Sequence, residues 1–203
     1  MKSTRLFVII FAIALIAVII YSLRDSQSPS DFTHEIQKER DEKDLFMKDG
    51  EDSPFKKVPF KGLNYYPPDL HYRITASIIP IDYKKVVRLS TSDGKVKKYN
   101  EYAYAAFSFG GSESRLLILE LTDPGPYHGT LFLAFIDSTS GNETYGAGRY
   151  LDLKKIPGAS TIVLDFNNAY NPYCAYSDDF SCPFPPKENV IHAAVRAGEK
   201  NYH

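Results

Sequence analysis

Residues 72–121 read YRITASIIPIDYKKVVRLSTSDGKVKKYNEYAYAAFSFGGSESRLLILEL, and this stretch decides the fold class. Its first apolar residues, Ile74, Ala76 and Ile78, alternate with polar ones, which is the period of a half-buried strand. Ser92-Asp93-Gly94 and Gly110-Gly111 are tight-turn signals that separate strands expected at 85–91, 95–109 and 114–121. Because such short connections join antiparallel neighbours, the stretch predicts a β-meander.

The same pattern continues towards the C-terminus. Apolar or alternating runs predict further strands at 130–136, 143–153, 160–166 and 189–197, with no helical period between them. The chain has 15 Tyr and 13 Phe but no Trp, and aromatic residues of this kind favour sheets. We therefore expect residues 51–203 to form one mainly β domain, an antiparallel rolled sheet or small barrel of about eight strands.

Residues 24–50 precede this domain and differ from it in composition. Residues 24–31 are polar and turn-rich, and we expect them to form a tether. A helix is expected from about residue 32 to 48, with Ser30 or Asp31 as its N-cap. Since the helix is almost wholly charged between Ile36 and Leu45, we expect it to be solvated, with Leu45-Phe46-Met47 docking on the domain.

Residues 1–23 predict a transmembrane signal anchor. The apolar run 6–23 spans about 27 Å as a helix, close to the roughly 30 Å of a hydrocarbon core. Lys2 and Arg5 precede it, so the positive-inside rule predicts a single-pass protein with a cytoplasmic N-terminus and an extracytoplasmic, periplasmic domain. The membrane is then a partner through residues 6–23. A cleaved signal peptide is one alternative, although residues 21–25 lack an A-x-A-like site, and a buried structural helix is the other.

Charge and histidine spacing argue against several function classes. The formal net charge of −1 offers no polycationic face, so no nucleic-acid partner is expected. The five histidines form no ligand-spaced pair, and no phosphate loop or nucleophile motif is complete. We therefore predict no metal and no cofactor, and the sequence leaves open whether the chain is an enzyme.

Two cysteines, Cys174 and Cys182, lie in a loop with four prolines. A disulfide between them would close a nine-residue loop and stabilise the domain by about 2.5 kcal/mol in the chain-entropy estimate. We expect this disulfide because an extracytoplasmic domain is exposed to an oxidising environment. A zinc site, a reactive thiol with His192 as its base, and unpaired buried cysteines are the alternatives.

Polar and aromatic residues gather around that loop and form the candidate ligand site. The candidates are Arg149, Asp165, Asn167, Tyr170, Asn171, Glu188, Asn189 and Glu199, with Tyr150, Tyr173 and Tyr176 as further apolar walls. Such a set suits a small polar ligand or an envelope protein, and this is the preferred hypothesis. The alternative is an envelope hydrolase that uses the carboxylates of Asp165, Glu188 or Glu199.

Arg149 follows Gly146-Ala147-Gly148, which we interpret as a bulge or a site of close backbone approach within a strand. A guanidinium here could grip an anionic ligand, but a structural ion pair with Asp165 or Glu188 is the preferred interpretation.

Several runs resemble the bacterial family called domain of unknown function 1684. They are Gly146 to Tyr150, Asp165 to Pro172, Cys174-Ala175-Tyr176, Cys182-Pro183 and, in the N-terminal half, Phe60 to Leu63 and Tyr66-Pro67-Pro68. The resemblance covers about residues 35–200 and implies that they form one domain. It implies no catalytic role for any residue.

Overall fold

The structure is a computed structural model that describes residues 28–202. The predicted anchor, residues 1–23, and the first residues of the tether lie outside the described residues. Within residues 28–202, no helix is long and apolar enough to cross a membrane.

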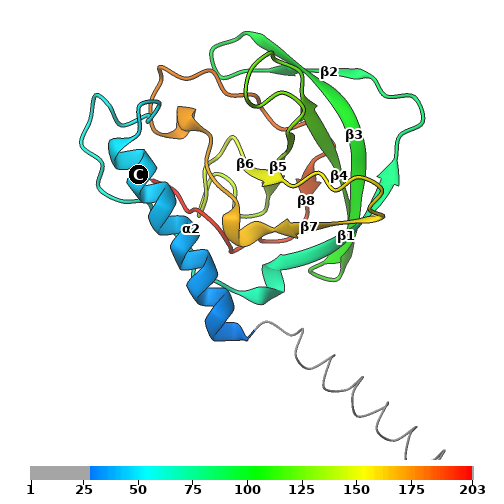
Figure 1. The fold of residues 1–203 in the computed structure, drawn as a ribbon, viewed down its shortest axis with the longest axis horizontal. Helices are drawn as coiled ribbons and strands as arrows, with labels where there is room; N and C mark the ends of the chain where they lie inside the picture. The colour runs from blue at the N-terminus through cyan, green and yellow to red at the C-terminus, as the bar shows by residue number, and fades with distance from the viewer. Residues whose placement is uncertain (1–27, 203) are drawn as a thin grey trace, which may run out of the picture.

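An eight-stranded curled sheet dominates the described part of the chain (Figure 1). Its strands are β1 (Arg73–Pro80), β2 (Val86–Ser90), β3 (Val96–Phe109), β4 (Ser112–Leu121), β5 (Leu131–Asp137), β6 (Arg149–Leu153), β7 (Thr161–Asp165) and β8 (Val190–Ile191). The order is β6-β5-β4-β3-β1-β7, with β2 paired to β3 and β8 to β5. Its two ends, β6 and β7, are not hydrogen-bonded neighbours, so the sheet is a half-barrel. The predicted mainly β, antiparallel rolled sheet is confirmed.

Two details of the sheet differ from the sequence-based prediction. The last strand covers only Val190 and Ile191 and runs parallel to β5, because the chain reaches it through the long proline-rich loop rather than a hairpin. Residues 143–148 form turns that precede β6 instead of belonging to it. The expected close backbone approach is confirmed at Gly148: its φ is +91°, and a Cβ there would lie 2.5 Å from the carbonyl oxygen of Phe135.

The sheet is buried on both of its faces at the centre of β4 and along β5. Along β4, Leu116 and Ile118 belong to the main core inside the half-barrel, together with Phe135 and Phe166. Leu117 and Leu119 point to the opposite face and belong to a second apolar cluster. The continuous run LLIL is therefore explained by apolar neighbours on either side of one strand.

The only α-helix of the described residues, α2 (Pro29–Asp49), lies along one side of the half-barrel (Figure 1). Ser28 is its N-cap, accepting the N–H of Asp31 at 3.1 Å, so the predicted caps Ser30 and Asp31 are wrong by two or three residues. The expectation of a solvated helix is wrong for one stripe, because Phe32, Ile36 and Arg40 are buried. The expected docking of its C-terminal end is confirmed for Met47 and wrong for Leu45 and Phe46, which are exposed. Sparse apolar residues at helical spacing were enough to dock it.

The segment after β7 carries the short 3-10 helices η2 (Phe166–Asn168) and η3 (Tyr173–Ala175). Two isolated backbone bridges hold it to the sheet, Tyr150 to Tyr170 at the outer edge of β6 and Thr91 to Pro183 just after β2. A further 3-10 helix, η1 (Leu70–Tyr72), leads into β1. The segment 166–183, α2 and the outer edge of β6 therefore surround a common cavity.

Candidate functional site: an aromatic cavity between α2 and the sheet

A cavity of about 1100 Å³ lies between α2, strands β3 to β6 and the segment 167–183. Its aromatic lining comprises Phe46, Tyr65, Tyr99, Tyr127, Phe132, Tyr150, Tyr170, Tyr173 and Phe180. Its charged lining comprises Glu39, Arg40, Lys43, Asp52, Lys97 and Asp152. This volume slightly exceeds the usual range of small-molecule pockets, and the aromatic content is typical of them.

The back wall is a ladder of rings on the second face of the sheet. Tyr99 of β3, Phe132 of β5 and Tyr150 of β6 stand in sequence, with ring centroids 5.3 Å apart for Tyr99 and Phe132 and 5.2 Å for Phe132 and Tyr150. Tyr170 continues the ladder edge-on to Tyr150 at 5.8 Å. Strand alternation places these residues on one face, and offset or edge-on contacts stabilise their packing.

Asp152 is a charged residue on this same wall of the cavity. It lies two residues after Tyr150 on β6, so the two side chains share a face, and its Oδ1 accepts the hydroxyl of Tyr170 at 2.8 Å. Its side chain is accessible to water, yet protein atoms surround it on most sides, as expected in an open recess. The resulting desolvation raises the pKa of Asp152, and that of Tyr170 is raised by desolvation and by the neighbouring carboxylate.

Lys43 of α2 closes one side of the cavity. Its Nζ lies 2.5 Å from Oε1 of Glu199 and 4.4 Å from the centre of the Tyr170 ring. Glu199 is buried and also accepts the backbone N–H of Asn171 and the hydroxyl of Tyr176. The acceptors of Glu199 are therefore engaged in holding α2, the loop and the C-terminal segment together.

Arg149 does not reach the cavity. Its side chain is fully buried and its Nη2 lies 2.9 Å from Oδ2 of Asp137, so the predicted partners Asp165 and Glu188 are wrong. It also donates to the carbonyls of Val195, Ala197 and Glu199. Asp137 is the last residue of β5, and the register of β5 with β6 places Phe135 opposite Arg149. The negative charge that pairs with Arg149 therefore comes from a strand and not from the proline-rich loop.

The other predicted polar candidates are dispersed. Asp165 lies 2.6 Å from Nε of Arg73 and caps η2 by accepting the backbone N–H of Asn167, whose side chain binds the backbone of Asp69. Asn189 is buried between β4 and β5, where it bonds to Leu117 and Ala134. Glu188 is exposed. Of the predicted set, the structure places Asn167 and Tyr170 at the cavity, and it also places Tyr150 and Tyr173 there.

The cavity contains functional candidates that the sequence interpretation missed, namely Arg40, Lys43, Tyr99, Phe132 and Asp152. The run Tyr150-Leu151-Asp152-Leu153 carried a signal for one of them. Residues two apart on a strand point to the same face, so Asp152 must lie on the same face as Tyr150. The residues of α2 carried no such signal, because charged residues surround them on the helix.

The predicted disulfide is not formed, since Cys174 and Cys182 are free thiols. They are nevertheless adjacent: Sγ of Cys182 accepts the backbone N–H of Cys174 at 3.2 Å. A hydrogen bond from Cys182 lowers the pKa of Cys174 to about 6, and the same contact raises the pKa of Cys182. Cys182 lines the cavity, so the thiol pair lies at its rim. The described residues contain no group of three side chains suited to a metal ion.

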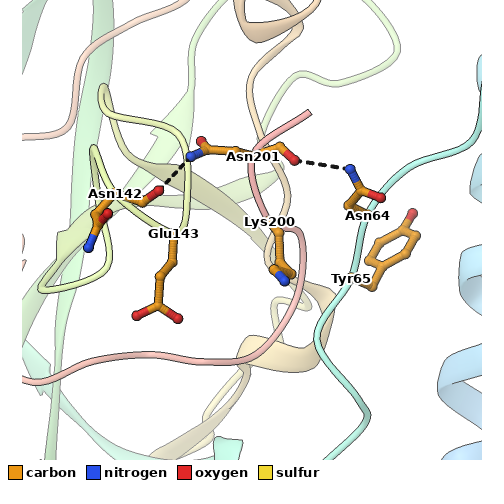
Figure 2. A pocket seen from close by; sticks show the side chains of 6 residues that line it. All are labelled: Asn64, Tyr65, Asn142, Glu143, Lys200 and Asn201. Atoms are coloured by element: carbon orange, nitrogen blue, oxygen red, sulfur yellow. Dashed lines mark hydrogen bonds between the residues drawn. The ribbon is translucent and has the colours of Figure 1, made fainter. Parts of the chain in front are cut away.

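A second, shallower depression of about 520 Å³ has a polar lining of Asn64, Tyr65, Asn142, Glu143, Lys200 and Asn201. Figure 2 shows two hydrogen bonds made by Asn201. The side-chain amide of Asn201 donates to the backbone carbonyl of Asn142, and the backbone carbonyl of Asn201 accepts from the side-chain amide of Asn64. Glu143 is bound by Arg196 and by the hydroxyl of Tyr66. These contacts fasten the C-terminal segment, and the depression lacks the apolar walls of the larger cavity.

Comparisons with known proteins agree on the family and the fold. The family model described as "Protein of unknown function (DUF1684)" matches residues 58–200. The solution NMR structure of the uncharacterized protein from gene locus rrnAC0354 of Haloarcula marismortui is 38% identical. The aligned region covers 84% of this chain and 95% of the Haloarcula marismortui chain, and the TM-score is 0.65. No curated protein matches the sequence.

Proposed function

The chain belongs to the DUF1684 family, and we propose that its domain binds a small organic molecule in the cavity between α2 and the half-barrel. The observation that carries this proposal is the position of Asp152. A carboxylate with one oxygen bound to Tyr170 lines an open aromatic recess, where the surrounding protein atoms disfavour its charge although water reaches it. An ionisable group kept in such a setting is a recurrent sign of a binding or active site.

The ligand class follows from the lining. The rings of Tyr99, Phe132 and Tyr150 are 6–7% exposed, so together they offer a limited apolar contact surface to the flat body of a ligand. Oδ2 of Asp152 can accept a hydrogen bond from a ligand donor, while Oδ1 is oriented by Tyr170. Few polar groups within apolar walls orient a ligand and make its binding specific.

A pair of tyrosine variants tests this proposal, using 1-naphthylacetamide as the probe and the full chain in lipid nanodiscs. Tyr127 lines the cavity although 71% of it is exposed, so Tyr127→Ala should leave folding intact and weaken binding about fivefold, the worth of one ring contact. Tyr83 is 86% exposed and lies outside the cavity, so Tyr83→Ala is the matched control and should bind as the parent does.

The readout is the fluorescence anisotropy of the naphthyl group, to which this chain adds no tryptophan emission because it has no Trp, and empty nanodiscs give the background. Equal affinities of the Tyr127 and Tyr83 variants, or no saturable binding by the parent, would refute the cavity as the site.

We also propose that residues 6–23 anchor the domain to the membrane on its extracytoplasmic side. The support is the apolar run itself and the two basic residues before it. An alkaline phosphatase reporter fused after His203, which is active only outside the cytoplasm, should be active. Activity of a cytoplasm-only reporter at the same position would refute this topology.

A further inference from the structure

Arg40 is a buried cation at the cavity that has no carboxylate partner among the described residues. It is 6% exposed, lies on the inner stripe of α2 and lines the cavity. Its Nη1 donates to the carbonyl of Tyr66 at 2.8 Å and its Nη2 to that of Asn167 at 3.3 Å. Its Nε is buried and has no hydrogen-bond partner.

The main-chain contacts explain how Arg40 is held, and Asp165 and Glu199 offset its charge only from a distance. Two neutral carbonyls and the face of Tyr65, whose ring centre is 4.5 Å from Cζ, surround the guanidinium. Placing an unpaired ion in such a site costs several kcal/mol, and a structural role alone could be met by a neutral donor. Burial indeed lowers the pKa of Arg40, because it disfavours the charged form.

The nearby carboxylates contact other groups, and Asp44, one turn further along α2, accepts the hydroxyl of Tyr65 at 3.3 Å. Asp165 is paired with Arg73, and Glu199 with Lys43. Glu39, which lines the same end of the cavity, accepts a hydrogen bond from Asn168. Arg40 is thus a cation at this end of the cavity that no described carboxylate contacts directly.

We propose that the α2 end of the cavity binds the anionic head of an organic acid, with Arg40 as its counterion and the aromatic ladder as the wall for its apolar body. This inference rests on the proposed function, since it names the charge of the ligand for the same cavity. Arg40 is a charged donor whose orientation is set by the protein, which favours a carboxylate over a neutral group of the same shape.

The test compares 1-naphthylacetate with 1-naphthylacetamide, which share the apolar body and differ in charge. At pH 7 the full chain in nanodiscs should bind the acetate at least tenfold more tightly, and Arg40→Gln should abolish that preference. Arg88 on β2 is exposed and outside the cavity, so Arg88→Gln is the matched control and should keep it. Circular dichroism reports whether each variant is folded.

A second measurement uses the parent protein alone, in case Arg40→Gln fails to fold. As the pH falls through the pKa of the free acid, the affinity for the naphthyl acid should fall to that for the amide. Equal binding of the two probes at pH 7, or a preference that survives Arg40→Gln, would overturn the assignment of Arg40 while the cavity still stands as a binding site. Absence of binding by both probes would overturn the cavity as well.

Discussion

Replacing Arg149 with alanine is expected to lower the free energy of unfolding by about 3–5 kcal/mol, the cost of stranding a buried charge. The charge left behind is that of Asp137, which is buried and also accepts the N–H groups of Thr139 and Val195. The change further removes the donors of three carbonyls in the C-terminal segment. For a domain of this size the melting temperature should fall by roughly 6–20 °C.

Arg196→Ala is the matched control for this experiment. Arg196 pairs with Glu143 at the surface, where 56% of its side chain is exposed, so its loss should change the melting temperature little. Arg149→Lys keeps the charge but cannot reach several acceptors at once, and it should recover only part of the stability. An unchanged melting temperature for Arg149→Ala would contradict the structural role.

Gly198→Ala is expected to have the second largest effect, about 3 kcal/mol of lost stability, from a left-handed backbone and a steric clash together. The φ of Gly198 is +73°, and a Cβ there would lie 2.4 Å from the carbonyl oxygen of Ala169 and 2.8 Å from that of Phe166. Both obstacles are backbone atoms, which cannot rotate away. The clash would separate the C-terminal segment from the floor of the cavity formed by residues 167–170.

Gly158→Ala separates the two causes. Gly158 has nearly the same φ, +75°, but open space around it, so its substitution should cost only the backbone term of about 1 kcal/mol. Urea unfolding of both variants measures the difference. Equal losses of stability would show that the close approach at Gly198 is absent.

The strands could be predicted from the sequence because their signals are local. Alternation in residues 72–80, the turn at Asp93-Gly94 and the apolar run of residues 131–136 each specify an element without reference to the rest of the chain. The features that were predicted wrongly depend on long-range contacts. The last strand at Val190–Ile191 and the docking of α2 depend on partners far away in sequence, which no local period reveals.

The site was predicted in part for the same reason. Tyr150 and Tyr170 stood out in an aromatic, turn-rich segment, and the structure brings them into contact. Arg40 and Lys43 come from a charged helix more than 100 residues away along the chain. Charged residues on a helix are ordinarily solvated, so only the tertiary structure distinguishes these two from their neighbours.

Intermolecular nuclear Overhauser effects between 1-naphthylacetamide and the tyrosine rings of the full chain test the cavity most directly. The probe's aromatic protons should show contacts to the rings of Tyr99, Tyr127, Tyr150, Tyr170 and Tyr173, which line the cavity, and none to Tyr83. Contacts confined to tyrosines outside the cavity, or none with any ring at saturating probe, would contradict the proposal that this cavity is the ligand site.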